Sequence, residues 1–366
     1  MRQTIISILF TAFSLCLFSQ NYFFNNIEAS YHRGFIAPHN ESMPHLYRGW
    51  FSSYHISISG KTTGNKDWHQ LYRYPYLGID FSYSGLGYPE VLGDAYSIMP
   101  HIKFNFINGK TYRLNARYAV GVGYLTKKYH YTENYRNTAI SSNLNLAVNI
   151  MFENEFLFKE RYNAILGVGF SHFSNGRTNT PNRGLNIPAV KLGFSIDNSK
   201  YQQPTNDSTD YKNNRDNDLL ILAFGGMAAS YPAGSKLSPR AGITSMYSYP
   251  VNLKYRIGLG YDFFYYYNNR NLLSHVVERE QEHIQWHINH GLYFAFQMDF
   301  GKNAFFLHKG IYIYDKYNFQ DNLFYHRVGF RHTFDNNLVF NLSLKTQFFT
   351  AQFFELGIGY KVFLND

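Results

Sequence analysis

A histidine and a serine separated by one residue, His172 and Ser174, form the pair in this sequence that is best suited to nucleophilic chemistry. A serine hydroxyl is a poor nucleophile until a base removes its proton, and an imidazole is the side chain that most often does so. In an extended strand, residues two positions apart project from the same face, so the two side chains can lie close together. The pair is therefore a candidate for attack on an ester.

Such a pair also needs a group that holds the imidazole and donors that stabilise an oxyanion. Asn186 can accept a hydrogen bond from the imidazole and fix its tautomer. Asn175, Asn182 and the backbone N–H groups around Gly176 are the candidate oxyanion donors. A His-x-Ser pair alone also fits two interfacial polar residues at the end of a strand, so the neighbouring loop decides the interpretation.

The segments that carry these residues alternate between apolar and polar positions, which is typical of β-strands. In residues 162–174 every second residue is mostly apolar, and the same set of positions ends with His172 and Ser174. In residues 186–196 the corresponding set of positions begins with Asn186. We expect the three side chains to extend lipid-facing stripes at the loop end of two adjacent antiparallel strands. There they would meet the bilayer where acyl chains join their head groups.

The same alternation runs from about residue 71 to the C-terminus, in segments that often reach about 12 residues, against ~5–6 for soluble strands. Polar side chains occupy the inward face in mid-strand, aromatic residues lie near segment ends, and short turns alternate with longer loops, as in outer-membrane barrels. The short turns are residues 108–110, 301–303 and 335–337, and the longer loops are residues 126–138, 174–185, 268–284 and 315–322.

We count roughly eight segments before residue 197 and up to about eight after residue 217. The sequence therefore predicts an all-β fold, an antiparallel transmembrane β-barrel of the outer-membrane type. It has either about 14–16 strands in one barrel, or an eight-stranded N-terminal barrel plus a second β unit. The single barrel is favoured, because two barrels would each need complete closure of their edges.

The N-terminus predicts export, because a positive start is followed by an apolar stretch and then by small and polar residues. Four regions are expected: a signal peptide at 1–20, a barrel region with the candidate site at 21–197, a polar linker or loop at 198–217, and additional strands at 218–366. The one cysteine, Cys16, falls in the signal peptide, so no disulfide and no thiol nucleophile are expected in the mature chain.

The composition excludes several classes of protein. Of the 366 residues, 19% are aromatic and only 16% are charged, which excludes a disordered chain. Beyond the N-terminus no apolar run reaches the ~18 residues of a spanning helix. The net charge of +9 suits an anionic surface such as lipopolysaccharide, and nucleic acid is not an expected partner of an exported chain.

The site segment resembles the lipid A 3-O-deacylase family (PagL-type, also called acyloxyacyl hydrolases). The family's hallmark is His-aromatic-Ser-Asn, a short loop, Pro-Asn-x-Gly, an aliphatic residue and a third catalytic residue. Here these are His172-Phe173-Ser174-Asn175, Pro181-Asn182-Arg183-Gly184, Leu185 and Asn186.

The resemblance implies an eight-stranded outer-membrane barrel with this motif on its last two strands. It implies Ser174 as the nucleophile and His172 as the base, with Asn175 and Asn182 near the oxyanion. The family's third residue is typically glutamate. Asn186 keeps the hydrogen-bond acceptor but cannot offset the imidazolium charge, so slower turnover is expected.

The expected function is a serine esterase, a carboxylic ester hydrolase that removes an ester-linked 3-hydroxyacyl chain from lipid A in the outer membrane. No cofactor and no protein partner are predicted. The alternatives are a phospholipase-like esterase that uses the same pair, and a non-catalytic porin-like or lipid-binding barrel in which Asn186 marks a degenerate motif.

Four cations fall in long loops at the same rim: Lys127, Lys128, Arg177 and Arg183. Our hypothesis is that they contact lipid A phosphates or sugar carboxylates, the alternative being ordinary solvated loop charges. Between residues 275 and 290, His283 and His287 would share a helical face with His290 near it, which suggests a metal site. No H-E-x-x-H is present and the stretch fits a charged loop entering a strand at Leu292, so no metal is predicted.

Overall fold

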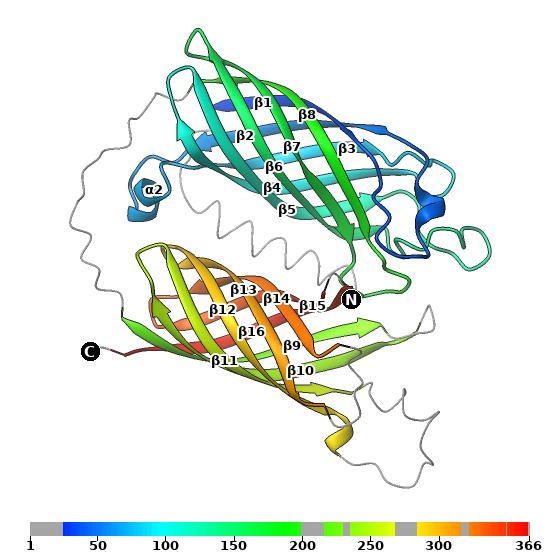
Figure 1. Cartoon of the computed structure of the whole chain (residues 1–366), viewed down its shortest axis with the longest axis vertical. Coiled ribbons are helices and arrows are strands. Elements are labelled where there is room, and N and C mark those ends of the chain that lie inside the picture. The colour runs from blue at the N-terminus through cyan, green and yellow to red at the C-terminus, as the bar shows by residue number, and fades with distance from the viewer. Residues whose placement is uncertain are drawn as a thin grey trace. The chain divides into compact units, whose positions relative to one another are not determined.

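The computed structural model describes residues 25–198, 216–229, 235–267, 284–315, 322–348 and 350–364. These residues form two closed antiparallel β-barrels of eight strands each (Figure 1). The predicted signal peptide and most of the predicted linker lie outside the described residues. Within them, helices are short, and none has the length and apolar character that crossing a membrane requires.

The first barrel closes between its first and last strands, with Asn26 opposite Asp197. A short helix, α2 (Asp67–Leu71), and a 3₁₀ turn, η1 (Pro44–Leu46), lie in its loops. Its strands are β1 (Asn26–Gly34), β2 (Phe51–Lys61), β3 (Tyr76–Gly85), β4 (Asp94–Asn108), β5 (Tyr112–Leu125), β6 (Leu144–Phe158), β7 (Tyr162–Ser174) and β8 (Leu185–Asp197).

The second barrel closes in the same way, with Leu364 opposite Asn217. A 3₁₀ turn, η2 (Ile284–Trp286), precedes its fourth strand. Its strands are β9 (Asn217–Ala229), β10 (Leu237–Pro250), β11 (Tyr255–Tyr266), β12 (Ile288–Phe300), β13 (Asn303–Tyr314), β14 (Phe324–Thr333), β15 (Leu338–Gln347) and β16 (Thr350–Leu364).

The predicted antiparallel barrel fold is confirmed, in the form of an eight-stranded N-terminal barrel plus a second β unit. The preference for one barrel of 14–16 strands was wrong, because each half satisfies its own edges through the β1–β8 and β9–β16 ladders. The strand pattern also begins earlier than residue 71. Strands β1 and β2 were not recognised individually, since serine and histidine on their inward faces weaken the contrast with the polar loops around them.

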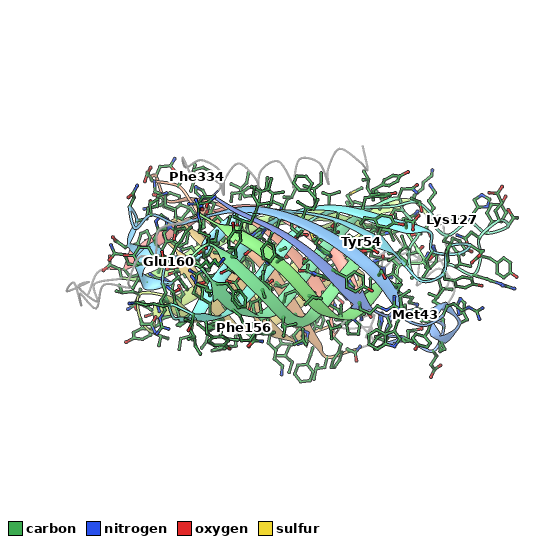
Figure 2. The ribbon with its side chains drawn as sticks, turned by 90° about the horizontal axis from the view of Figure 1, so that it is seen from above. Met43, Tyr54, Lys127, Phe156, Glu160 and Phe334 are labelled. Atoms are coloured by element: carbon green, nitrogen blue, oxygen red, sulfur yellow. The ribbon has the colours of Figure 1, made fainter. Side chains whose placement is uncertain are left out.

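Apolar side chains face outward around the wall of the first barrel. Figure 2 shows Tyr54 and Phe156 on this wall, with exposed fractions of 56% and 40%. Met43 and Lys127 lie at one end of the barrel, among the long loops, and Glu160 lies at the other end, in a tight turn (Figure 2). An apolar band between two rims is the organisation of an outer-membrane barrel. At the rim of Glu160 the connections are tight turns except for residues 62–75, between β2 and β3, which contain α2.

The interior of the first barrel is filled with paired charges. Lys191 Nζ lies 2.6 Å from Glu28 and 2.6 Å from Glu153, and Arg117 pairs with the same two carboxylates. Lys103 lies 2.5 Å from Glu155. An eight-stranded barrel leaves room inside only for side chains, so the polar inward face predicted from the alternation is occupied by these ion pairs.

The interior of the second barrel follows the same rule. Arg327 lies between Glu355 and Asp262, at 2.5 Å and 3.2 Å. His287 is buried and within hydrogen-bond distance of the Tyr266 carbonyl, whereas His290 lies on the outward register of β12 beside Tyr261. The prediction that His290 lies near the helical face of His283 and His287 was therefore wrong for His290, because the strand already begins at Ile288. Residues 275–283 lie outside the described residues.

Candidate active site

Strands β7 and β8 place His172 directly opposite Asn186, as Cα partners of one antiparallel ladder. Leu166 and Val168 are exposed on the register of His172, and Val190 is exposed on the register of Asn186. Both polar side chains therefore extend apolar stripes on the outer wall of the first barrel.

The inward neighbours of these residues explain why the polar side chains point outward. Phe173, Leu185 and Ile187 are at most 4% exposed and belong to one apolar core cluster at the long-loop end of the barrel. This cluster also contains Met43 and Leu46 from the β1–β2 loop. Because successive strand residues alternate between faces, burying Phe173 and Leu185 commits His172 and Asn186 to the opposite face.

The His172 imidazole is held by Asn186. Nδ1 of His172 lies 2.6 Å from Oδ1 of Asn186, and a carbonyl oxygen can only accept, so Nδ1 carries the proton and donates it. The neutral imidazole then has a lone pair on Nε2. His172 is thus in the tautomer that a general base for a serine hydroxyl requires.

Ser174 is the last residue of β7 and lies on the same register as His172, two positions away. It pairs across the ladder with Leu146 of β6 and is 4% exposed. Within the described residues, no hydrogen bond joins Ser174 Oγ to the imidazole. Such contacts are often loose in hydrolases without substrate and tighten in the reacting complex.

Gly184 lies against the imidazole of His172. Its φ is +79°, and a Cβ built at this position would come within 2.8 Å of His172 Cε1 and 3.4 Å of Nε2. The glycine is therefore required for two reasons, the left-handed backbone and the close approach of the ring. The Gly184 N–H also donates to the Ala139 carbonyl at 3.0 Å, which fixes the loop to its neighbour.

Replacing Gly184 by alanine is expected to lower kcat roughly 10- to 100-fold, because the new methyl displaces the imidazole from its productive position. Gly49→Ala is the matched control. Gly49 also has a positive φ, +109°, but a Cβ there meets nothing within 4 Å. We expect that variant to keep its activity, and equal losses in the two variants would assign the effect to backbone strain instead of the ring contact.

Asn175 and Asn182 organise the loop that follows β7. The Asn175 N–H donates to Asn182 Oδ1 at 3.0 Å, and Asn175 Nδ2 donates to Ser142 Oγ at 2.9 Å. Asn175 is fully buried, and Gly176 follows it with a φ of +61°. The two asparagines thus set the course of the chain next to Ser174, while their oxyanion role stays a prediction.

The four candidate cations lie in two loops of the long-loop rim. Lys127 and Lys128 are exposed between β5 and β6, and Lys127 Nζ donates to the Glu90 carbonyl at 3.2 Å. Arg177 and Arg183 lie between β7 and β8, Arg177 with a φ of +66°. Arg183 is two residues before Leu185, the first residue of β8, so it is next to the site in the chain. A role in binding phosphate stays a prediction for all four.

His39, in the β1–β2 loop, is a further residue of the site that was not predicted from the sequence. Its Nδ1 lies 3.0 Å from Nδ2 of Asn186, and its Nε2 lies 2.9 Å from the Arg183 carbonyl oxygen. The residue stands 133 positions before His172 in the chain, outside the motif. Only the pairing of β1 with β8 brings it to Asn186, so no local sequence signal identifies it.

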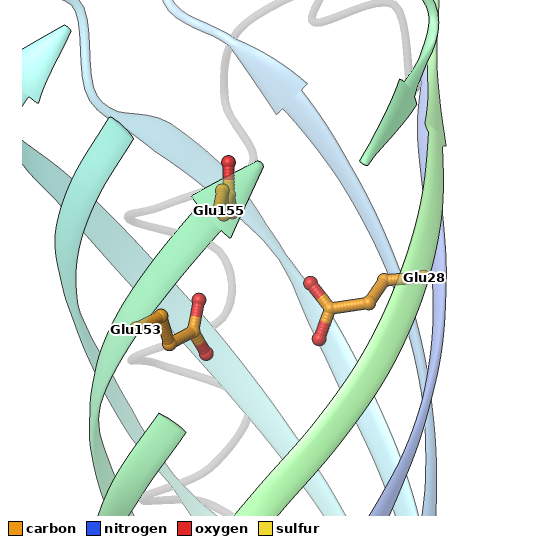
Figure 3. Close-up of side chains that lie close together, drawn as sticks. All are labelled: Glu28, Glu153 and Glu155. Carbon is orange, nitrogen blue, oxygen red and sulfur yellow. The ribbon is translucent and has the colours of Figure 1, made fainter. Parts of the chain in front are cut away.

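Among the described residues, one group of three side chains has the proximity of metal ligands: Glu28 of β1 with Glu153 and Glu155 of β6 (Figure 3). Glu28 and Glu153 extend toward each other in the barrel interior (Figure 3), and one ligand atom from each of the three carboxylates lies within 4.8 Å of the others. Each already has a cationic partner, Lys191 and Arg117 for Glu28 and Glu153, and Lys103 for Glu155. The group therefore belongs to the internal ion network.

Two family descriptions match the chain, one for each barrel. Residues 52–195 match "Lipid A 3-O-deacylase (PagL)", and residues 217–365 match "Acyloxyacyl hydrolase, C-terminal domain". No curated protein matches the chain significantly.

The solved structures that match this chain include the following three. The outer membrane enzyme PagL is 17% identical, covers 46% of this chain and 97% of its own, and has a TM-score of 0.31. Neisserial surface protein A is 11% identical, with coverages of 47% and 96% and a TM-score of 0.31. A mutant of the Rh. blastica porin is 9% identical, with coverages of 92% and 99% and a TM-score of 0.19.

Proposed function

Because the N-terminal barrel belongs to the lipid A 3-O-deacylase (PagL) family and the C-terminal barrel to the acyloxyacyl hydrolase C-terminal domain family, we propose that this outer-membrane chain is a serine esterase of lipid A. It removes an ester-linked 3-hydroxyacyl chain. The observation that carries the proposal is the outward-facing His172, held by Asn186 in the tautomer of a general base, on the same stripe as Ser174.

In the proposed reaction, rotation of the Ser174 side chain brings its hydroxyl to Nε2 of His172. Nε2 takes the proton while Oγ attacks the acyl carbonyl, and the resulting oxyanion receives hydrogen bonds from donors around Asn175, Gly176 and Asn182. The C–O bond to the sugar breaks, and the imidazolium returns the proton to the sugar oxygen. A water, deprotonated by the same imidazole, then attacks the carbonyl of the acyl-Ser174 ester. The acyl C–Oγ bond breaks, the imidazolium returns the proton to Ser174 Oγ, and the fatty acid is released.

An apolar groove on the outer wall supports an acyl substrate. It is lined by Leu166 and Val168 of β7 and by Val190 and Leu192 of β8, on the same stripes as His172 and Asn186. An acyl chain in the bilayer can lie along these residues with its ester at the polar end of the stripes. An ester at this end of the stripes belongs to a lipid within the membrane, not to a soluble molecule.

Asn186 makes the proposed enzyme slower than one with a carboxylate at this position. Its carbonyl accepts the Nδ1–H of His172 at 2.6 Å, but it carries no charge to stabilise the imidazolium that forms when Ser174 loses its proton. The expected consequence is a reduced kcat with little change in KM, since lipid binding does not involve this charge.

Mass spectrometry of lipids from cells that express the chain tests the proposed function. We expect lipid A to lose the mass of one 3-hydroxyacyl chain, with the free fatty acid recovered, in cells that carry the intact chain and not in cells without it. Appearance of lysophospholipid with unaltered lipid A would instead identify a phospholipase-like esterase. Unchanged lipids in both classes would identify a non-catalytic barrel.

A further inference from the structure

Building on the proposed esterase, we propose that His39 is a positioning residue that sets the direction of the Asn186 amide and so selects the active tautomer of His172. Three side chains, His172, Asn186 and His39, form a continuous hydrogen-bonded row that ends on the backbone of Arg183. Each hydrogen bond in the row has one donor and one acceptor. Because the Arg183 carbonyl at the end of the row can only accept, it determines which atom donates in each of the other bonds.

Strand β1 delivers His39 to this position by extending its pairing with β8. Beyond Gly34, Phe35 N–H donates to the Pro188 carbonyl at 3.3 Å, and Ala37 N–H donates to the Asn186 carbonyl at 2.8 Å. The following residue, Pro38, needs no hydrogen-bond acceptor and keeps Ala37 extended. The chain therefore runs alongside the backbone of Asn186 immediately before His39.

The Arg183 carbonyl determines the direction of the row because a carbonyl oxygen can only accept. His39 Nε2, at 2.9 Å, must therefore carry the proton, which leaves a lone pair on Nδ1 of the neutral ring. That lone pair accepts from Nδ2 of Asn186 at 3.0 Å. The Ala37 carbonyl, 3.5 Å from the same Nδ1, is also an acceptor and does not compete for the amide.

With Nδ2 turned to His39, Oδ1 of Asn186 faces His172 and accepts its Nδ1–H. An asparagine amide has nearly the same shape after a half-turn, and the half-turn would present an NH₂ group to Nδ1. His172 would then carry its proton on Nε2 and could not act as a base. A carboxylate at position 186 accepts on both sides, so it would need no partner to orient it.

The test reverses donor and acceptor in the hydrogen bond between residues 39 and 186. It is made in the unmodified chain and in the Asn186→Glu variant. Lysine only donates, so in His39→Lys the amide should turn its oxygen outward, and kcat on lipid A micelles should fall roughly 10-fold or more. In His39→Gln the side-chain carbonyl can accept from Nδ2, and activity should stay near the original value. In the Asn186→Glu background, His39→Lys should cost less than about twofold, because a carboxylate accepts from both neighbours.

Equal losses from His39→Lys in the Asn186 and Asn186→Glu backgrounds would overturn the proposal, since a loop brace would act alike in both. His45→Ala is the matched control. His45 lies in the same loop, and its Nε2 is 2.7 Å from the Arg136 carbonyl, away from Asn186. We expect this variant to retain the rate of the unmodified protein.

Nitrogen NMR of the His172 ring separates this inference from the proposed function. The proton should reside on Nδ1 in the unmodified protein and on Nε2 in His39→Lys. If the unmodified protein releases no fatty acid, the proposed function fails, and the tautomer shift still decides the role of His39. An Nδ1 proton in both proteins would overturn that role.

Discussion

Ser174→Ala is expected to stop fatty-acid release from lipid A, with kcat at least roughly 10³-fold lower, because alanine has no hydroxyl to attack the ester carbonyl. The measurement is the rate of 3-hydroxy fatty acid release from purified lipid A in detergent micelles. Lipid A binding should persist, since the alanine keeps the outward stripe that ends at this position.

Ser171→Ala provides the matched control on the same strand. Ser171 lies on the opposite register from Ser174, and its hydroxyl accepts a hydrogen bond from Asn149 Nδ2 at 2.9 Å. Its replacement removes a structural hydrogen bond and leaves the outward face intact, so the rate should stay within about twofold. A Ser174→Ala variant that retained a tenth of the activity would refute the serine mechanism.

The second large effect concerns stability. Arg117→Met is expected to lower the unfolding free energy of the first barrel by about 3–5 kcal/mol, because it leaves buried carboxylates short of one cation. Arg117 is 2% exposed and pairs with Glu28 and with Glu153, whose side chains are also buried. After the change, Lys191 still pairs directly with both carboxylates, at 2.6 Å from each.

A double variant makes this prediction specific. Arg117→Met combined with Glu153→Gln removes one charge of each sign and leaves Lys191 paired with Glu28, so it should be more stable than Arg117→Met alone. Urea unfolding in micelles, followed by tryptophan fluorescence in a Trp286→Phe background, reports on Trp50 and Trp68 of the first barrel. Losses of unfolding free energy that simply add in the double variant would contradict a coupled network. Arg33→Ala is the control, and because Arg33 is exposed it should lower the unfolding free energy by less than about 1 kcal/mol.

The contacts of Gly184 and His39 could not be predicted from the sequence, for two different reasons. Gly184 belongs to the motif. A glycine is needed there because a Cβ would lie 2.8 Å from the imidazole, and this contact depends on how the loop folds back onto β7. His39 belongs to no motif. It reaches Asn186 only because β1 closes the barrel against β8, a contact between residues more than 140 positions apart.

The prediction of a single barrel was wrong. Counting strands gave about eight on each side of the polar stretch, but alternation is a local property and does not state which strands pair at the edges. The pairing of Asn26 with Asp197, and of Asn217 with Leu364, is what separates two closed barrels from one.

The local pattern of residues was enough to predict the class of fold and the lipid-facing direction of the strands, because a period of two assigns each side chain to one face or the other. It also singled out His172, Ser174 and Asn186, because they stand close together in the chain. Barrel closure, the ion pairs inside the barrels, and the approach of His39 to Asn186 are seen only in the folded chain. Those depend on contacts between distant segments, and no local spacing encodes them.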